Sequence, residues 1–180
     1  MIKFTYLEQS ANSFTFEMPK LKAWVENQCE GKVLNLFAGK TLLAIDEVRN
    51  DIDRDMPAQY HLDAEEFVKM AIEKGWKFNT IIIDPPYNWR KAKELYNGNY
   101  IGHYPILKDL LKEIINDNGL VITFGYDSVG MSASRGFKKI EICLICHNGD
   151  SKDTICLVER KLSVNKTKIA KSSKFKEYFQ

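Results

Sequence analysis

The feature that most constrains the fold is an apolar run, Ile81-Ile82-Ile83, which ends in Asp84-Pro85-Pro86-Tyr87. Three consecutive β-branched residues favour a strand that is buried on both faces, as in the centre of a parallel sheet. The carboxylate, the two prolines and the aromatic ring then end the strand abruptly. The sequence therefore predicts a central strand whose carboxyl end faces a ligand.

Strands and helices alternate along most of the chain. Helices are predicted over residues 19–29, 64–74, 89–96 and 105–115, with Asn118-Gly119 as the cap of the last one. Strands are predicted over residues 33–37, 80–83, 120–124, 140–146 and 154–159, another strand ends near Asp51, and residues 1–15 are a strand or a loop. The last two strands flank a turn and predict an antiparallel hairpin. This order predicts an α/β fold: a doubly wound, mostly parallel seven-stranded sheet with helices on both faces and an antiparallel C-terminal hairpin.

The length of 180 residues fits one domain that can bury its own core. We assign residues 1–162 to this domain, with residues 1–30 as an N-terminal extension of strand and helix and residues 163–180 as a basic tail. The start of the chain is unlike a signal peptide, and no apolar run approaches the roughly 20 residues of a membrane span. We therefore expect a cytoplasmic protein with reduced cysteines and no membrane partner. The net charge of +2 is too balanced to indicate a nucleic-acid partner by itself.

Residues suited to ligand binding stand at the predicted strand ends. Gly39 would let the backbone approach a ligand closely. Asp51 could accept two hydrogen bonds from a ribose diol, or it could be a surface acid. Asp63-Ala64 stands directly before a helix, so Asp63 could hold an adenine edge or could simply be the helix N-cap. These positions are candidates for one ligand site at the carboxyl edge of the sheet.

The group Asp84-Pro85-Pro86-Tyr87 is more specific. Proline has no N–H, so the carbonyl groups and the carboxylate of this turn are acceptors without a competing donor beside them. An exocyclic base amine has two hydrogens to donate, and accepting them makes its nitrogen a better nucleophile. Tyr87 adds a ring on which a planar base could stack, worth roughly 1–3 kcal/mol in single-strand binding sites. The group indicates a cradle for a base amine, and the alternative is a rigid turn at the end of a buried strand.

Four segments in order, Val33-Leu34-Asn35-Leu36-Phe37-Ala38-Gly39, Asn50-Asp51-Ile52-Asp53, Asp63-Ala64 and residues 81–87, resemble the motifs of class I S-adenosylmethionine-dependent methyltransferases. The Asp-Pro-Pro-Tyr ending is similar to the amino-methyltransferases that modify adenine N6 or cytosine N4 in DNA, or guanine N2 in some RNAs. The resemblance covers roughly residues 31–162. The chain departs from the pattern in having one glycine in the first motif and a short crossover after it.

The resemblance implies S-adenosylmethionine as the cofactor and nucleic acid, DNA rather than RNA, as the partner. It assigns cofactor binding to Asn35, Leu36, Phe37, Ala38, Gly39, Asp51, Ile52, Asp63 and Ala64. Within this set, Asp51 would bind the ribose, with Asp53 as a fallback, and Asp63 the adenine. The catalytic group would be Asp84, Pro85, Pro86 and Tyr87. The implied reaction is methyl transfer to adenine N6 in DNA, with guanine N2 in RNA or cytosine N4 in DNA as alternatives.

Two other motifs mimic unrelated families. Gly39-Lys40-Thr41 looks like the end of a phosphate-binding loop, but Leu34 stands where that loop needs its first glycine. Cys143-Leu144-Ile145-Cys146-His147 has the letters of a haem attachment site. Strand positions three apart face opposite sides, so we expect ordinary sheet cysteines and no metal site, including a zinc site that adds Cys156. A non-catalytic nucleic-acid-binding relative of the same fold is the remaining alternative.

Basic residues supply candidate phosphate contacts. Trp89, Arg90, Lys91 and Lys93 follow the fourth motif, and residues 97–104 form a predicted loop. From Arg160 to Lys176 the chain carries no acid. Such a run is usually a solvated face, but beside a base-modifying site a phosphate-binding role is equally expected. An enzyme acting on a duplex would also have to flip the base out.

Overall fold

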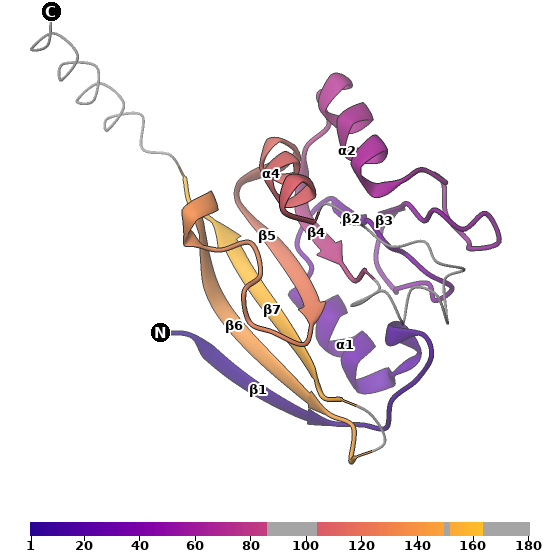
Figure 1. The fold of residues 1–180 in the computed structure, drawn as a ribbon, viewed down its shortest axis with the longest axis vertical. Helices are drawn as coiled ribbons and strands as arrows, with labels where there is room; N and C mark the ends of the chain where they lie inside the picture. Colours follow the sequence, from indigo (N-terminus) through magenta and orange to yellow (C-terminus); the bar gives the residue numbers. More distant parts are fainter. Residues whose placement is uncertain (86–103, 150–151, 164–180) are drawn as a thin grey trace, which may run out of the picture.

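The computed structural model describes residues 1–85, 104–149 and 152–163. Its centre is a seven-stranded sheet in the order β1-β6-β7-β5-β4-β2-β3 (Figure 1). The strands are β1 Lys3–Glu8, β2 Val33–Asn35, β3 Glu47–Arg49, β4 Phe78–Ile83, β5 Ile115–Gly125, β6 Phe137–Cys146 and β7 Thr154–Lys161. The helices are α1 Pro19–Gln28, α2 Ala64–Glu73 and α4 Tyr104–Ile114, with single 3-10 turns at η1 Thr15–Glu17 and η2 Ala133–Arg135.

The sheet has the predicted doubly wound, mostly parallel architecture. Strands β3, β2, β4 and β5 run parallel, and β7 is antiparallel to both β5 and β6. From β2 the chain first moves outward to β3 and then returns to the other side of β2 as β4. The winding therefore reverses between β2 and β4, and their carboxyl ends lie at the point where open α/β sheets bind ligands.

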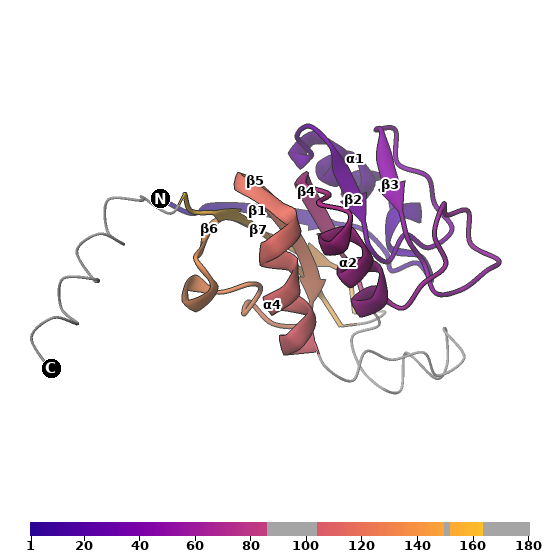
Figure 2. The same ribbon diagram turned by 90° about the horizontal axis from the view of Figure 1, so that it is seen from above.

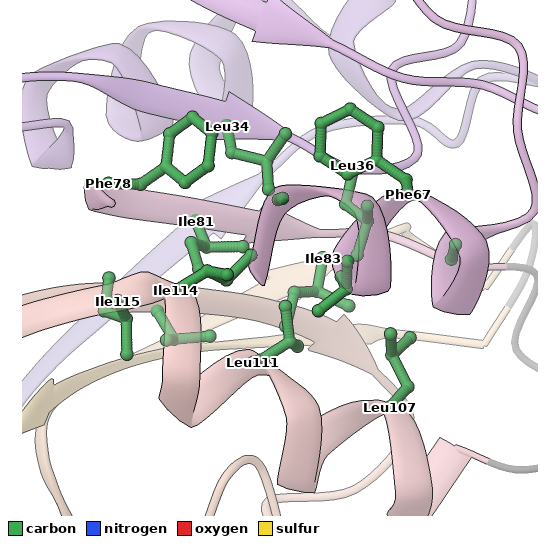
Figure 3. Packing of buried hydrophobic residues seen from close by; sticks show 14 of the residues in the cluster. Leu34, Leu36, Phe67, Phe78, Ile81, Ile83, Leu107, Leu111, Ile114 and Ile115 are labelled. Atoms are coloured by element: carbon green, nitrogen blue, oxygen red, sulfur yellow. The ribbon is translucent and has the colours of Figure 1, made fainter. Parts of the chain in front are cut away.

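Helices cover both faces of the sheet, as predicted. In Figure 2, α1 lies on one face and α2 and α4 lie on the other. Strand β4 supplies both cores, because Ile81 and Ile83 pack in the cluster with α2 and α4 while Ile82 packs in the cluster with α1. Figure 3 shows Leu107 and Leu111 of α4 on the side of the helix that meets β4. All three isoleucines are fully buried, so the prediction of a strand buried on both faces is confirmed.

Most predicted boundaries agree with the structure within a few residues, and one cap is wrong. The helices predicted over residues 19–29, 64–74 and 105–115 are α1, α2 and α4. The helix predicted over residues 89–96 lies outside the described residues. Helix α4 ends at Ile114, and Asn118-Gly119 does not cap it. Ile115 is buried and already pairs with Phe78, so Asn118, with φ of 62°, lies in an irregularity of β5 instead.

The N-terminal extension is part of the sheet. Residues predicted as a strand or a loop form β1, which pairs in parallel with β6 and supplies the seventh strand. Nothing in the described ranges matches a membrane span, since even the 11-residue α4 is too short and the other helices are no better suited.

Cys143 and Cys146 are sheet residues of β6, as predicted from their spacing. Cys143 of β6 lies directly opposite Cys156 of β7, and both are buried free thiols. Cys146, three residues after Cys143, is only half-buried. Across the part of the chain that the structure describes, no group of three or more His, Cys, Asp or Glu side chains is placed to hold a metal ion.

Candidate functional site

The carboxyl ends of β2 and β4 bring the first and fourth motifs together. The register pairs Asn35, the last residue of β2, with Ile82, so Leu36 and Asp84 leave the two strands at the same end of the sheet. Asp84 and Pro85 are half-buried at this edge. Pro86 and Tyr87 lie outside the described residues. The predicted methionine-side segment and the predicted amine cradle therefore meet at the point where the winding reverses.

The Gly39 turn is joined directly to Asp51. Gly39 has φ of 58°, a left-handed conformation that glycine adopts without strain. Its N–H donates to Asp51 Oδ2 over 2.7 Å, and the N–H of Asp53 donates to Asp51 Oδ1 over 3.0 Å. A carboxylate has about four lone-pair positions, so each oxygen can accept a further hydrogen bond. Asp51 thus links the two segments and retains the capacity to bind hydroxyl groups.

Arg49, which the sequence analysis did not single out, holds the segment after β2. Its side chain is 3% exposed, and its guanidinium donates to the carbonyls of Ala38 (3.1 Å), Gly39 (2.9 Å) and Thr41 (3.0 Å). No helix joins β2 to β3, so these carbonyls have no helical partner. The rigid fork of arginine donors replaces the bonds that a crossover helix would have made.

Glu47 and Asn35 extend this buried polar group. The Glu47 carboxylate is in contact with Arg49 Nη1 and accepts from Asn35 Nδ2 over 2.9 Å. Asn35 is fully buried, and its Oδ1 has no hydrogen-bond partner among the described residues. Reversing the amide would place Oδ1 against the carboxylate, so the hydrogen-bond network fixes this assignment. A buried acceptor without a donor costs about 1–3 kcal/mol, which a ligand that donates to it would recover.

Asn50 ties three segments of the site to one another. Its backbone N–H donates to the carbonyl of Asn35 over 3.0 Å, and its carbonyl accepts from Ala38 over 3.0 Å. Its side-chain amide donates to the carbonyls of Leu36 (3.2 Å) and Leu62 (3.0 Å) and accepts from the N–H of Leu62 (3.2 Å). The first, second and third predicted cofactor segments are therefore held together by backbone-directed hydrogen bonds.

The remaining predicted cofactor residues have different environments. Asp63 is the N-cap of α2, and its Oδ1 accepts from the N–H of Glu65 over 2.8 Å. Ala64 is buried in the core, whereas Ile52 is 46% exposed beside Asp51. The capping role considered for Asp63 is thus observed, and its role toward adenine stays a prediction.

Helix α4 adds an aromatic residue near Asp84, Tyr104, and a basic residue one turn further along the helix, Lys108. Burial raises the pKa of Tyr104, and the negative charges of Asp84 and Asp127 raise it further, so its phenol stays protonated over a wide pH range. Lys108, one turn later, lies 4.1 Å from the centre of the Tyr104 ring and donates to the carbonyl of Gly130 over 2.7 Å. Burial lowers the pKa of this lysine. The i, i+4 spacing of Tyr104 and Lys108 just before the fifth strand is the signal that could have identified them.

The Gly39 turn does not have the geometry of a phosphate-binding loop. Lys40 points to the N-terminal extension, where its Nζ lies 3.7 Å from Glu17 and 5.7 Å from the centre of the Phe14 ring. The segment after Thr41 reaches β3 without a helix. A phosphate-binding loop needs the N-terminus of a helix directly after its lysine, so the nucleotide triphosphatase alternative is wrong.

Comparisons with known proteins support the fold. No protein-family model matches the sequence, and no curated protein matches it. A protein from Streptococcus mutans described as a SAM-dependent methyltransferase aligns with a TM-score of 0.57 and 14% identity, covering 78% of this chain and 48% of its own. The methyltransferase SMU.776, complexed with SAH, aligns with a TM-score of 0.60 and 15% identity, covering 82% and 50%.

A third structure resembles this chain over more of its own length. The 1,6-didemethyltoxoflavin-N1-methyltransferase of Burkholderia thailandensis, with 1,6-didemethyltoxoflavin and S-adenosylhomocysteine bound, aligns with a TM-score of 0.51 and 9% identity, covering 79% and 76%. This chain spans about half the length of the first two proteins. At these identities the comparisons show a shared Rossmann-like fold, in agreement with the architecture predicted from the sequence.

Proposed function

We propose that this protein is an S-adenosylmethionine-dependent methyltransferase that modifies an exocyclic amine of a nucleic-acid base, most strongly adenine N6 in DNA. The observation that carries the proposal is the meeting of the Gly39–Asp51 turn with Asp84 at the reversal of the winding. The fold is shared with structures described as methyltransferases, and two of them hold S-adenosylhomocysteine or SAH. The site and the fold therefore support the same reaction class.

The residues at the edge of β2 and β3 fit the proposed cofactor. S-adenosylmethionine, when bound, supplies a methyl group on a sulfonium centre. Asp51 would accept from the ribose hydroxyls with its remaining lone pairs, and the exposed side chain of Ile52 would pack against the adenine. Asn35 Oδ1 is a buried acceptor that a ligand ammonium group would satisfy. Asp63 would turn its second carboxylate oxygen toward the adenine edge.

Asp84 and Pro85 form the proposed amine cradle. The Asp84 carboxylate and the Pro85 carbonyl accept the two amine hydrogens and thereby orient the nitrogen lone pair. Pro86 would keep the turn rigid and Tyr87 would stack on the base, both as predictions from the motif. The reaction needs no covalent intermediate on the protein, because positioning and electrostatics alone lower the barrier to in-line transfer.

The substrate class rests on the motif and not on the fold. The Tyr ending of the fourth motif favours adenine in DNA, with guanine N2 in RNA and cytosine N4 in DNA as alternatives. The Burkholderia enzyme was solved with a small heterocycle bound, so a free heterocyclic amine is a second candidate for this chain. A test must therefore offer polymers and small molecules separately.

The decisive experiment identifies the methylated product. The protein is incubated with methyl-labelled cofactor and DNA, RNA or free nucleosides, the polymers are digested, and the labelled nucleoside is identified. We expect labelled N6-methyldeoxyadenosine from DNA. If the label appeared instead in RNA or in a free nucleoside, that molecule and not DNA would be the substrate. Transfer to none of them would contradict the proposed function.

A variant pair tests the role of Asp84. Asp84→Asn should lower turnover by at least about a thousand-fold, or ~4 kcal/mol of transition-state stabilisation, while it keeps cofactor affinity. Asp117→Asn is the matched control, because Asp117 lies outside the site and its only ion pair is with Lys161 at 3.7 Å among the described residues. Normal turnover in an Asp84→Ala protein that still binds the cofactor would show that the assigned role is wrong.

The basic tail begins at the opposite edge of the sheet from the site. Ser163, the last described residue, contacts Asn118 Oδ1 at the amino end of β5, whereas Asp84 directly follows Ile83, which pairs with Thr123 near the carboxyl end of β5. Truncation after Leu162 should weaken DNA binding. It should also make the slope of log K against log salt concentration less negative, by about 0.9 for each lost phosphate contact. An unchanged affinity would exclude the tail as a contact.

A further inference from the structure

Along the middle of β1, the backbone groups on the outer edge make no hydrogen bond to any residue that the structure describes. β1 is the last strand of the sheet and pairs with β6 on one side only. The N–H of Gln9 donates to the carbonyl of Cys146, so the odd-numbered residues of this segment direct their backbone groups toward β6. Backbone direction alternates along a strand, and the N–H and carbonyl groups of Phe4 and Tyr6 therefore point away from the sheet. Such an edge is a template for a further strand.

The side chains along this edge are exposed and aromatic. Phe4 is 65% exposed and Tyr6 is 54% exposed. Thr5, between them, points to the opposite face, where it donates to Glu141 over 2.7 Å, and Glu141 also accepts from Trp24 of α1. Phe4 and Tyr6 thus lie on the face away from α1. Figure 2 shows α2 and α4 over the other half of that face, beside β4 and β2 rather than beside β1.

No described side chain protects the central part of this edge against an incoming strand. Edge strands are often protected by a lysine that repels an incoming strand. The Lys3 ammonium instead bonds Glu141 on the α1 face over 3.1 Å. Lys20 donates to the outward carbonyl of Glu8 over 2.9 Å and so occupies only the end of the strand. The open part of the edge is therefore the stretch of Phe4 and Tyr6.

We propose that two copies of this chain associate through an antiparallel pairing of their β1 strands, with Thr5 opposite the partner's Thr5. A two-fold axis perpendicular to the sheet requires that opposed side chains share a face, so an even-numbered residue must oppose an even-numbered one. In this register Phe4 opposes the partner's Tyr6, and each such pair exchanges two backbone hydrogen bonds. The outward groups of β1 are the ones that this pairing requires.

The same register makes the side chains complementary. Each Phe4 meets the partner's Tyr6 on the face away from α1, and the two threonines meet on the α1 face. Aromatic and threonine cross-strand pairs each stabilise a sheet by roughly 0.2–1 kcal/mol in host proteins, and this register forms two aromatic pairs and one threonine pair. A second copy of the chain is therefore the occupant that this edge fits.

The expected interface is small. With the strand edge, the two aromatic side chains and Ile2, which is 49% exposed, the pair would bury roughly 800–1,000 Å² in total, near the lower limit for specific complexes. The dimer should therefore be reversible and form in the micromolar range or above. It lies at the far end of the sheet from β2 and β3, so it does not depend on the proposed function.

Sedimentation velocity over about 1 to 500 μM tests the proposal on the full chain. The wild-type protein should move from the monomer mass of 20.8 kDa toward twice that mass as concentration rises. Tyr6→Lys should weaken association at least ten-fold, whereas Leu162→Lys, which changes a 51% exposed leucine elsewhere, should leave it unchanged. A protein that stays monomeric throughout, or a Tyr6→Lys variant that dimerises as wild type does, would overturn the proposal.

Disulfide trapping tests the register. The two Thr5 positions form a pair without direct hydrogen bonds, with Cα atoms about 4.5 Å apart, which is within the reach of a disulfide. Thr5→Cys, made in a background without Cys29, Cys143 and Cys146, should cross-link on oxidation, with circular dichroism to verify the fold. Cys143 has to be removed because it is the register partner of Thr5 on β6 and could form a disulfide within one chain. Leu7→Cys is the control, because Leu7 opposes the partner's Lys3 and should stay reduced. Cross-linking through Leu7 and not Thr5, or through neither, would contradict this pairing.

Discussion

Two segments pack against the same sheet through different interactions. The connection from β2 to β3 is fixed by a buried polar network around Arg49, and helix α4 is fixed by apolar packing. The connection is irregular, and the buried Arg49 guanidinium holds it by binding its carbonyl groups. Helix α4 instead packs Leu107, Leu111 and Ile114 in the apolar cluster that includes Ile81 and Ile83 (Figure 3). The polar network leaves glycine, carboxylate and amide groups at the strand ends, where a ligand can bind them. The apolar packing of Leu107, Leu111 and Ile114 contributes stability but no such groups.

Substitutions in the polar network and in the apolar packing should also have different effects on stability and on ligand binding. A buried charge network is stable only when complete, because the loss of one member leaves the others unpaired in a low dielectric. An apolar contact loses transfer energy and leaves a cavity, and the rest of the core stays satisfied. Substitutions in the polar network should therefore lower ligand affinity as well as stability, whereas substitutions in the apolar packing should lower stability alone.

The largest effect is expected from Arg49→Met. Removing the guanidinium leaves the Glu47 carboxylate without its buried cation and four carbonyl groups, including that of Pro57, without their donor. The loss should cost about 3–5 kcal/mol of the free energy of unfolding, measured by urea denaturation. Cofactor binding by the folded fraction, measured by calorimetry, should fall at least ten-fold. Arg160→Met is the control, because Arg160 is partly exposed, with its nearest acid, Glu30, at 3.5 Å, and should cost under about 1 kcal/mol.

Leu111→Ala should come next, at about 3 kcal/mol. Leu111 is fully buried between α4 and the sheet, so its truncation leaves a cavity. The loss is read from the shift of the urea midpoint at constant slope. Cofactor affinity should stay within two-fold of wild type. If Leu111→Ala lowered cofactor affinity as much as Arg49→Met does, the proposed difference between the polar network and the apolar packing would be wrong.

Periodicity and composition were sufficient to predict the sheet and the helices. The isoleucine triplet identified the central strand, and its buried faces are occupied as predicted. The role of Arg49 could not be predicted. Three of its acceptors are carbonyls eight to eleven residues earlier that are open only where a crossover helix is missing, and a fourth is the carbonyl of Pro57, eight residues later. The cap at Asn118 was wrong because a β-bulge and a helix end both favour a residue with positive φ.

The fold brings some of the predicted site residues together, and their binding and catalytic roles stay predictions. The linkage of Gly39 with Asp51 and the position of Asp84 agree with the motif order. Tyr104 was not singled out from the sequence, because only the fold places the start of α4 near Asp84. The pairing of β1 with β6 was also beyond the sequence, since the two strands are more than 130 residues apart. Non-local contacts of this kind leave no periodic signal.

A smaller, pH-dependent effect on stability is expected at Glu141, whose carboxylate accepts hydrogen bonds from Lys3, Thr5 and Trp24 of the N-terminal extension. Burial acts to raise the pKa of this carboxyl, but hydrogen bonds from Thr5, Trp24 and Lys3 outweigh it, and the net shift is downward. The stabilisation is therefore complete above the unfolded pKa of about 4.3 and is lost as pH falls through the lower folded pKa.

Glu141→Gln tests this dependence. The variant should be about 1–2 kcal/mol less stable than wild type at pH 7, because one charged acceptor is replaced by a neutral amide. The difference should stay constant down to about pH 5 and shrink below pH 4, in urea denaturation at several pH values. A difference that grew on acidification would mean that the folded pKa is raised and not lowered.

The smallest effect on stability is expected at Asp63, the N-cap of α2, which directly follows the segment bound by Asn50. Asp63→Ala removes the N-cap acceptor of the Glu65 N–H and should cost about 1 kcal/mol of stability, measured by thermal unfolding. Asp63→Asn keeps a side-chain oxygen that caps nearly as well but removes the charge, so it should leave stability within about 0.3 kcal/mol. The pair separates the two roles of this residue. If Asp63 also binds the cofactor adenine, both variants should weaken cofactor affinity although only one is destabilised, and if it is a cap alone, Asp63→Asn should bind the cofactor as wild type does.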